Sequence, residues 1–338
     1  MRKSIGLAAA LCGALLSGVA LCSTDPVLEW NAIMVSTTAG QNPFLQARSA
    51  AITQLAVFEA VNTIDGDFDP YLGTLTASPG ASPEAAAITA AHDVLLNFFP
   101  GSQAALDQAQ EVSLGRIPDS PAKHNGIAVG AASAAAFIQL RSSDGSTPAR
   151  FYVPLSLSPG EWQKTPSCPP AGGILLQWPD LRPFAIESAD QFRSAPQPVL
   201  GSPRYAHDYD EVLRVGGVDS QFRPQDRADV ARFFAATPPV SVWNSVAAQL
   251  AVEQGGSMSD RARTLALINI GISDAAAAVF DTKYSDHFWR PETAIHASGN
   301  TSWMPYVKAP CFPTYGSAHA SLSGAAREVL ERIYGRGQ

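Results

Sequence analysis

Apolar residues recur every three or four positions along most of the chain, which is the period of an α-helix. Residues 48–62 show this pattern at Ile52, Leu55, Ala56 and Val61. Strand-like alternation of apolar and polar residues is scarce. Helices are therefore expected at 48–62, 83–98, 121–141, 205–215, 224–236, 241–254, 259–284 and after Ser317. The pattern predicts an essentially all-α fold.

Two of these segments begin with a helix-start signature. Ser82-Pro83 and Ser120-Pro121 each offer an N-cap side chain followed by Pro at the first helical position, where its missing N–H is harmless. The segment between 121–141 and 205–215 lacks any sustained period. Residues 142–204 are rich in Pro, Gly and Ser, and an irregular stretch this long usually links or covers functional parts. We expect it to pack on the helices.

The N-terminus has the composition of an export signal. Arg2 and Lys3 precede a largely apolar run that ends at Cys22, as in a secretory signal peptide. We expect residues 1–22 to be removed and residues 23–338 to form one helical domain, secreted or periplasmic. A lipid anchor on Cys22 is the alternative, but the bulky Leu21 does not suit lipoprotein processing.

The net charge of −7 and a pI near 5.3 argue against nucleic acid as a partner, since no basic stripe is present. With 46% hydrophobic residues, the chain can bury one large core or two smaller ones. The longest apolar run after the signal, Gly126–Ile138, is shorter than the roughly 18 to 20 residues that a bilayer requires. We expect no membrane span after the signal peptide, and we expect Gly126–Ile138 to be a buried helix packed through small residues.

Two cysteines, Cys168 and Cys311, remain once the signal is removed. In an oxidising compartment they can form a disulfide, although nothing in the sequence requires it. A zinc site is less favoured, because neither has a second Cys or His at ligand spacing.

Candidate chemistry lies towards the C-terminus. Lys283 and Arg290 are separated by about two helical turns, which would place them on one side and about 10 Å apart along the axis. Such a pair can hold a small tetrahedral anion. Pro291 disfavours helix at Arg290, so this side chain is expected to leave from a helix end. The alternative is an exposed ion-pair ladder through Asp286.

A second element follows about thirty residues later. Ser317 is placed to cap the helix that follows it, and the free N–H groups of the first turn favour an anion. His319 would stand there as a proton donor or acceptor. The alternative is a capping serine with an incidental, solvent-facing histidine.

Lys283-x6-Arg290-Pro291 followed by Ser317-x-His319 resembles the first two signatures of the vanadium-dependent haloperoxidase and type 2 phosphatidic acid phosphatase superfamily. Supporting similarity to its soluble, secreted, all-α branch runs from about Arg48 onwards. It includes Ala56-Val57-Phe58-Glu59-Ala60-Val61-Asn62, Pro183-Phe184, Tyr205-x2-Asp208 and Trp243-Asn244.

The resemblance implies a helical bundle and a role for each residue of the motifs. Lys283, Arg290, Ser317 and the Ala318 N–H would bind the oxygens of vanadate or phosphate, and His319 would be the acid–base residue. Phe312 lies where chloroperoxidases carry an aromatic residue beside the halide. A haloperoxidase would take peroxide and halide as substrates and vanadate as cofactor, whereas a phosphatase would take a phosphoester at the same site.

The chain departs from the family pattern at three points. Gly316 stands in place of the usual Pro, and Ala318 in place of the usual Gly. The third signature, Ser-Arg-x5-His-x3-Asp, is expected a few tens of residues after His319, but the sequence given ends at Gln338 without it. We therefore expect the anion-site region, 259–338, to be truncated, the last helices and the vanadium-ligating His to be missing, and this chain to be inactive as it stands.

The remaining histidines do not suggest a metal site. His287 would share a face with Lys283 and Arg290, where the family has no ligand. His92, His124, His207 and His296 have no pairing that indicates metal or base chemistry. Three hypotheses remain: a vanadium haloperoxidase-like oxidoreductase, an acid phosphatase using the same residues, and a non-catalytic exported protein that binds an anion.

Overall fold

The computed structural model describes residues 25–336, and this part of the chain is all-α, with isolated β-bridges but no strand. The expected fold class is confirmed. The α-helices are α1 (Pro26–Thr38), α2 (Pro43–Asp65), α3 (Pro83–Phe98), α4 (Gln103–Gly115), α5 (Pro121–Leu140), α6 (Pro203–Val215), α7 (Gln225–Ala236), α8 (Pro239–Glu253), α9 (Met258–Asp286), α10 (Pro291–Ala297) and α11 (Ala318–Tyr334). The expected signal peptide and the lipid-anchor alternative lie outside the described residues.

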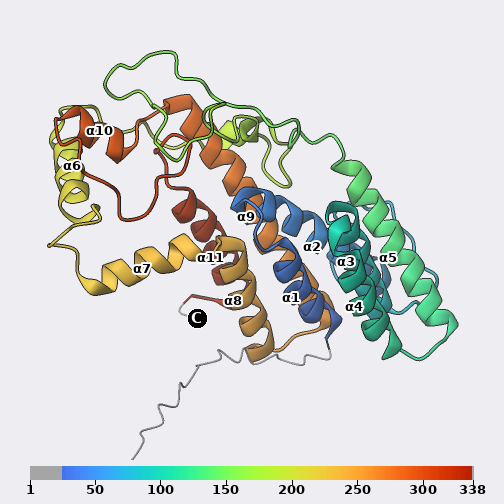
Figure 1. Ribbon diagram of the computed structural model, residues 1–338. Coiled ribbons are helices and arrows are strands. Elements are labelled where there is room, and N and C mark those ends of the chain that lie inside the picture. The colour runs from blue at the N-terminus through green and yellow to red at the C-terminus, as the bar shows by residue number, and fades with distance from the viewer. Residues whose placement is uncertain (1–24, 337–338) are drawn as a thin grey trace, which may run out of the picture.

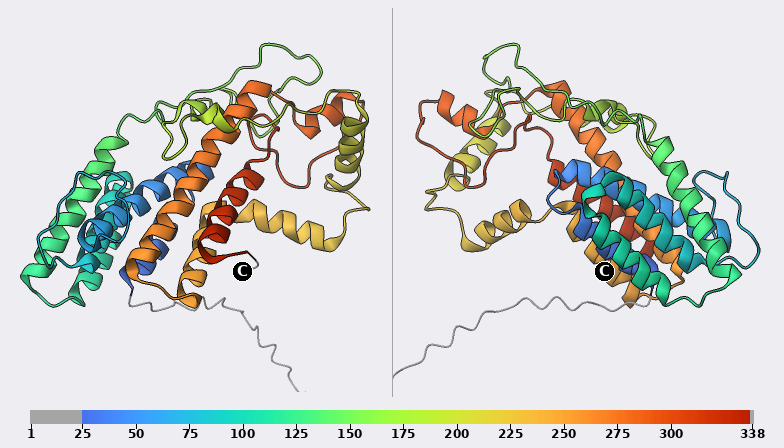
Figure 2. Two further views of the ribbon diagram at one scale, coloured as in Figure 1. Left: turned by 180° about the vertical axis from the view of Figure 1, so that it is seen from behind. Right: turned by 45° about the vertical axis from the view of Figure 1, so that its right-hand side comes forward.

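The long helix α9 is the centre of the molecule. It packs against α1, α2, α8 and α11, and the two ends of the molecule lie on either side of it (Figures 1 and 2). One end is formed by α3, α4 and α5, and the other by α6 and α10. Four large apolar residues of α9, Leu265, Ile268, Ile272 and Phe280, are fully buried. Burial of this kind is the main source of stability in a helical bundle.

Helix α9 is the longest apolar helix in the described part of the chain. Among residues 25–336 it is the one helix that is long and apolar enough to cross a membrane, by length and composition alone, and 72% of its most apolar stretch is buried by the rest of the protein. The sequence interpretation considered only Gly126–Ile138 and overlooked α9, because charged residues interrupt its apolar run. The extent of its burial is that of a core helix.

Capping side chains fix where several helices begin. The Ser82 hydroxyl accepts the Ala85 N–H at 3.1 Å, and the Ser120 hydroxyl accepts the Lys123 N–H at 3.2 Å. Both caps are followed by Pro, as predicted from the sequence. A good N-cap contributes about 1 kcal/mol. The first residues of α3 and α5 are therefore determined by the local sequence.

Helices α3 and α5 approach one another closely through glycine. A Cβ added to Gly126 would lie 2.2 Å from the Ser82 carbonyl oxygen, and one added to Gly130 would lie 2.4 Å from the Ala86 carbonyl oxygen. These distances are shorter than any van der Waals contact. The expected packing of Gly126–Ile138 through small residues is confirmed, but the helix is buried on one side only, since Ala128, Ala132 and Ala135 are exposed.

The sequence interpretation missed α1, α4 and α10. Helix α4 buries only Leu106 and Ser113, so it shows little apolar stripe. Helix α1 buries Val27, Trp30, Asn31, Met34 and Thr38, mainly on one face and at helical spacing, which the sequence interpretation overlooked. Its start was nevertheless visible in the sequence, because Asp25 caps the helix and is followed by Pro26.

The irregular segment between α5 and α6 contains only two short 3₁₀ helices, η2 (Trp178–Asp180) and η3 (Ala189–Phe192). It packs on the helices, since Trp162 and Trp178 are fully buried. The Asp274 carboxylate of α9 accepts the backbone N–H groups of residues 184–186 at 2.7 to 3.1 Å. A buried carboxylate therefore holds this segment against the central helix.

Candidate anion-binding site

Helix α9 stops before Arg290, and this corrects the predicted geometry of the two cations. His287 ends the helix in the left-handed conformation, with φ of 50°, and Arg290 is the extended N-cap residue of α10. The two side chains therefore do not share one helical face two turns apart. They converge because the chain turns back between the helices, with Arg290 leaving from a helix end as Pro291 predicted.

The Lys283 side chain is 1% exposed. Its ammonium group donates to the carbonyl oxygens of Pro313 at 3.1 Å, Thr314 at 2.9 Å and Gly316. Lys283 thus holds the loop before α11. Burial, and then the charge of Arg290, lower the pKa of Lys283 to about 6. The three carbonyl oxygens act in the opposite direction: each accepts one N–H, and only the ammonium form has three N–H groups to donate.

The Arg290 guanidinium is buried and only partly bonded. Its Nε donates to the Phe312 carbonyl oxygen at 2.7 Å, while its Nη2 is buried without a hydrogen-bond partner among the described residues. Burial lowers the pKa of Arg290 to about 10. An unpaired buried donor costs about 1–3 kcal/mol, so an acceptor that reached this nitrogen would be bound favourably.

The alternative of an exposed ion-pair ladder is wrong. Lys283 and Arg290 are buried, and neither pairs with Asp286 or with another described carboxylate. Burial raises the pKa of Asp286, and its Oδ2 lacks a hydrogen-bond partner in the described part of the chain. No carboxylate of the described residues therefore compensates the charge of Arg290 or of the protonated form of Lys283.

Phe312 lies beneath both cations. Its ring centroid is 5.1 Å from the Lys283 Nζ and 4.9 Å from the Arg290 Cζ, within the range of a cation–π contact. Phe44 and Phe280 pack against its edge at 5.9 and 5.1 Å between centroids. Lys283 and Arg290 therefore lie against an apolar, aromatic surface.

The predicted N-cap of α11 is confirmed. The Ser317 hydroxyl accepts the Ala320 N–H at 3.3 Å, so α11 begins at Ala318 with first-turn N–H groups that have no acceptor within the helix. The His319 side chain is exposed and lies against α7, with its Nε2 3.0 Å from the Phe234 carbonyl oxygen. The alternative of a capping serine with an incidental, solvent-facing histidine is therefore correct in part. Ser317 is a cap and His319 is exposed, but the His319 ring has a defined hydrogen-bond partner.

One cavity of about 910 Å³ brings all the predicted residues together. Its volume is in the range of small-molecule sites. Besides Lys308, it is lined by Lys283, Arg290, Phe312, Ser317, Ala318 and His319. No described Asp or Glu lines it. A cavity with three basic side chains, a helix N-terminus and no acid favours an oxyanion.

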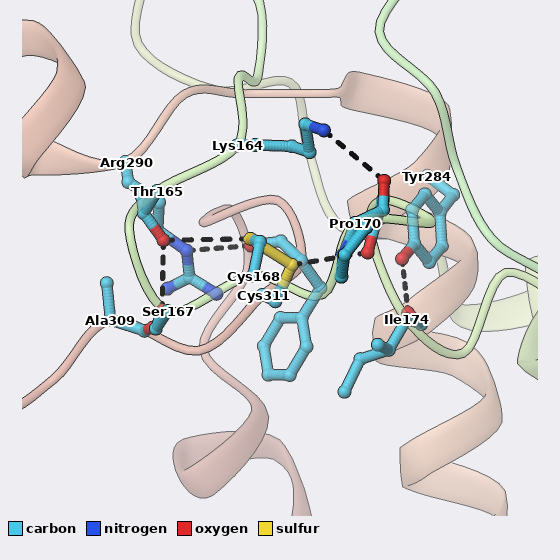
Figure 3. Close-up of a disulfide and its surroundings, with 12 residues drawn as sticks. Lys164, Thr165, Ser167, Cys168, Pro170, Ile174, Tyr284, Arg290, Ala309 and Cys311 are labelled. Atoms are coloured by element: carbon cyan, nitrogen blue, oxygen red, sulfur yellow. Dashed lines mark hydrogen bonds between the residues drawn. A yellow bond between two sulfur atoms is a disulfide. The ribbon is translucent and has the colours of Figure 1, made fainter.

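A disulfide secures the cavity wall. Cys168 of the irregular segment is bonded to Cys311, whose neighbour is Phe312, so the pairing left open by the sequence is formed. Figure 3 shows the surrounding bonds: the Ser167 hydroxyl donates to the Ala309 carbonyl at 2.6 Å. In addition, the Ile174 N–H donates to the Cys311 carbonyl at 2.9 Å. The irregular segment therefore covers this side of the site.

Lys308 was not predicted as a site residue, and His287 lies in a different place from the one predicted. Lys308 lines the cavity but belongs to no motif, and its nearness in sequence to Phe312 was the one available signal. His287, expected on the same face as Lys283 and Arg290, instead stacks on Tyr152 with 4.7 Å between ring centroids. Its left-handed backbone removes it from the helical face.

Comparisons with known proteins agree with this geometry. The family model described as the VCPO second helical-bundle domain matches residues 263–338, which include Lys283, Arg290, Ser317 and His319. A vanadium chloroperoxidase of Curvularia inaequalis is 25% identical over 191 residues, an alignment that covers 45% of this chain. That alignment spans 31% of the length of the relative.

Solved structures show the same fold. A bacterial vanadium-dependent iodoperoxidase superposes with a TM-score of 0.75 at 23% identity, covering 92% of this chain and 80% of its own. A bacterial vanadium-dependent chloroperoxidase without its cofactor superposes with a TM-score of 0.67 at 15% identity, covering 88% of this chain and 79% of its own. The matched family model, the curated relative and the shared fold together support the superfamily of vanadium haloperoxidases and type 2 phosphatidic acid phosphatases.

Proposed function

We propose that the cavity binds vanadate and that the whole protein is a haloperoxidase-like oxidoreductase, which uses peroxide to oxidise a halide. The observation that carries this proposal is the Arg290 Nη2, a buried donor with no partner in the described part of the chain, beside a buried lysine that no carboxylate neutralises. An oxyanion supplies both the missing acceptor and the missing negative charge.

The residues present fit such a group. Arg290 would donate to its oxygens, together with the Ser317 hydroxyl and the Ala318 N–H at the start of α11. The three N–H groups of Lys283 already serve carbonyl oxygens, so Lys283 would contribute its charge and the position of the loop. When bound, vanadate supplies a centre that activates peroxide.

His319 is suited to move a proton at a defined atom. Because the Phe234 carbonyl can only accept, the Nε2 that lies 3.0 Å from it carries the hydrogen. In the neutral ring Nδ1 is then the acceptor. His319 would therefore take up a proton at Nδ1, at the rim of the cavity that it lines.

Phe312 and the two cations above it would serve the halide. A large, weakly hydrated anion gains from positive charge and from an apolar surface at the same time, and the ring lies about 5 Å from both charges. We further propose that the protein acts outside the cytoplasm, in a secreted or periplasmic location, which the Cys168–Cys311 disulfide supports.

The test uses the natural full-length protein. Vanadate binding is measured by titration, and bromination of a phenolic dye is followed with peroxide, bromide and vanadate. Arg290→Ala is expected to abolish both, because a phosphate-type anion loses its buried donor. Arg327→Ala on the exposed side of α11 is the matched control and should retain both.

The other outcomes separate the alternatives. Release of phosphate from a phosphomonoester without any bromination would identify an acid phosphatase. Vanadate or phosphate binding that depends on Arg290, with no turnover of either kind, would identify an anion-binding protein. If neither anion binds, the site assignment itself is wrong.

A further inference from the structure

A second cavity adjoins the first. It has a volume of about 580 Å³ and lies between α6, α7 and the loop that follows α10. The two cavities share a wall, whose residues line both: Arg290, Lys308, Ala309, Pro310 and His319. A molecule in the second cavity would therefore be in contact with the arginine and the histidine of the anion site.

The second cavity has aromatic walls that the fold holds in place. The Tyr306 N–H donates to the Gly216 carbonyl at 2.9 Å, and the Trp303 indole N–H donates to the Leu213 carbonyl at 3.3 Å. Phe234 of α7 lines the cavity while remaining 43% exposed. A half-exposed aromatic ring on a cavity wall is available to stack on a planar ligand.

The charge in this cavity is mainly positive. Arg223, Arg290 and Lys308 line it, against one described carboxylate, that of Glu292. The Arg223 Nη1 donates to the Val215 and Gly217 carbonyls at 2.8 and 2.7 Å, and its guanidinium stacks on Tyr306 at 3.6 Å. The positive charge is therefore fixed beside an aromatic surface, and it favours a ligand with a negative group.

We infer that the second cavity binds a small aromatic anion, such as an aryl carboxylate, next to the anion site. The aryl ring stacks on the aromatic wall, and the negative group faces the basic residues. That this anion is the organic substrate of the enzyme rests on the proposed function. That it binds in the second cavity does not. The shared wall with His319 places this ligand where it can meet the product of the first cavity.

The experiment is a calorimetric titration of the full chain with three matched probes. Benzoate has both the ring and the charge, cyclohexanecarboxylate has the charge alone, and benzamide has the ring alone. Benzoate is expected to bind about three- to tenfold more tightly than either, the range that an aromatic contact contributes. Equal binding of benzoate and cyclohexanecarboxylate would contradict an aromatic site.

Substitutions locate the binding. Phe234→Ala and Lys308→Ala should each weaken benzoate binding about threefold or more, from the loss of a stacking partner and of a charge. Phe222→Ala and Lys164→Ala are the controls, because they remove an exposed ring and an exposed charge that do not line the cavity. Weakening by the controls as much as by the test variants would overturn the assignment.

A titration in saturating phosphate distinguishes this inference from the proposed function. Benzoate should still bind when phosphate fills the first cavity. Competitive displacement would mean that benzoate occupies the anion site itself, and the inference would fail, as it would if benzoate did not bind at millimolar concentration. Benzoate binding without any phosphate or vanadate binding would refute the proposed function and leave the second cavity intact.

Discussion

At the scale of single residues, Lys283 is subject to opposing influences. Burial and Arg290 lower its pKa to about 6, while three carbonyl oxygens hold its side chain in place. In the unfolded chain the ordinary pKa is 10.5. The difference between these two values leads to two pH-dependent effects.

The first effect is on stability. Between pH 6 and pH 10.5 the unfolded lysine holds a proton that the folded lysine lacks, so unfolding takes up a proton and the stability rises as the pH rises. This contribution is up to about 1.4 kcal/mol per pH unit, and below pH 6 it is constant. Denaturation of wild type and Lys283→Met between pH 6 and 9 should show a shallower slope in the variant. Parallel slopes would contradict the lowered pKa.

The second effect is on anion binding. An anion beside Nζ favours the ammonium form, so sulfate, which does not titrate in this range, should bind together with up to one proton above pH 6. Calorimetry in buffers of different ionisation enthalpy measures that proton. Lys283→Met should lose the uptake and His319→Gln should keep it. Unchanged uptake in Lys283→Met would assign the proton to another group.

The sequence predicted the residues of the site better than their geometry. Lys283 and Arg290 were expected to converge along one helix, whereas His287 ends that helix and the chain turns back. The bonds from Lys283 to residues 313–316 are tertiary, and no local pattern encodes them. Lys308 was missed for the same reason, because only the folded loop brings it to the cavity.

At the scale of elements, the close contact of α3 and α5 depends on two glycines. In Gly130→Ala the new methyl group would lie 2.4 Å from the Ala86 carbonyl oxygen, so the helices must separate. Overpacking of this kind costs about 1–3 kcal/mol, and chemical denaturation should show a loss in that range.

Gly324→Ala in α11 is the matched control. A Cβ there meets nothing within 4 Å, so the variant should gain about 0.5–1 kcal/mol from helix propensity. If both variants were stabilised, the close approach of α3 and α5 would not be required.

Helix boundaries were predictable where a side chain encodes them. Ser82, Ser120 and Ser317 each cap the helix that was expected to follow. By contrast, α7 buries only Ala228, and its contact with the site through Phe234 and His319 has no sequence signal. The position of α7 depends on tertiary contacts alone.

At the scale of the whole molecule, the disulfide joins the irregular segment to the loop of the site. Cys168 and Cys311 are 143 residues apart, and a cross-link over a long loop typically contributes about 2–5 kcal/mol. The double variant Cys168→Ser with Cys311→Ser should lose stability in this range. It should also bind sulfate more weakly, because Phe312 follows Cys311 directly.

The matched control is reduction of the wild type, which should reproduce both changes while leaving the double variant unaffected. Full sulfate affinity in the reduced protein would show that the remaining bonds, such as that from Ser167 to Ala309, suffice to hold the loop.

The same disulfide closes a covalent ring that contains α6 to α10 and both buried cations. Within this ring, Val199 is 76% exposed, so a protease could cut the backbone there. The two fragments would remain joined through Cys168 and Cys311, and the C-terminal fragment would keep all the basic residues of the cavity. Such a nicked protein would migrate as one species without reductant and as two with it, so a single cut need not take the site apart.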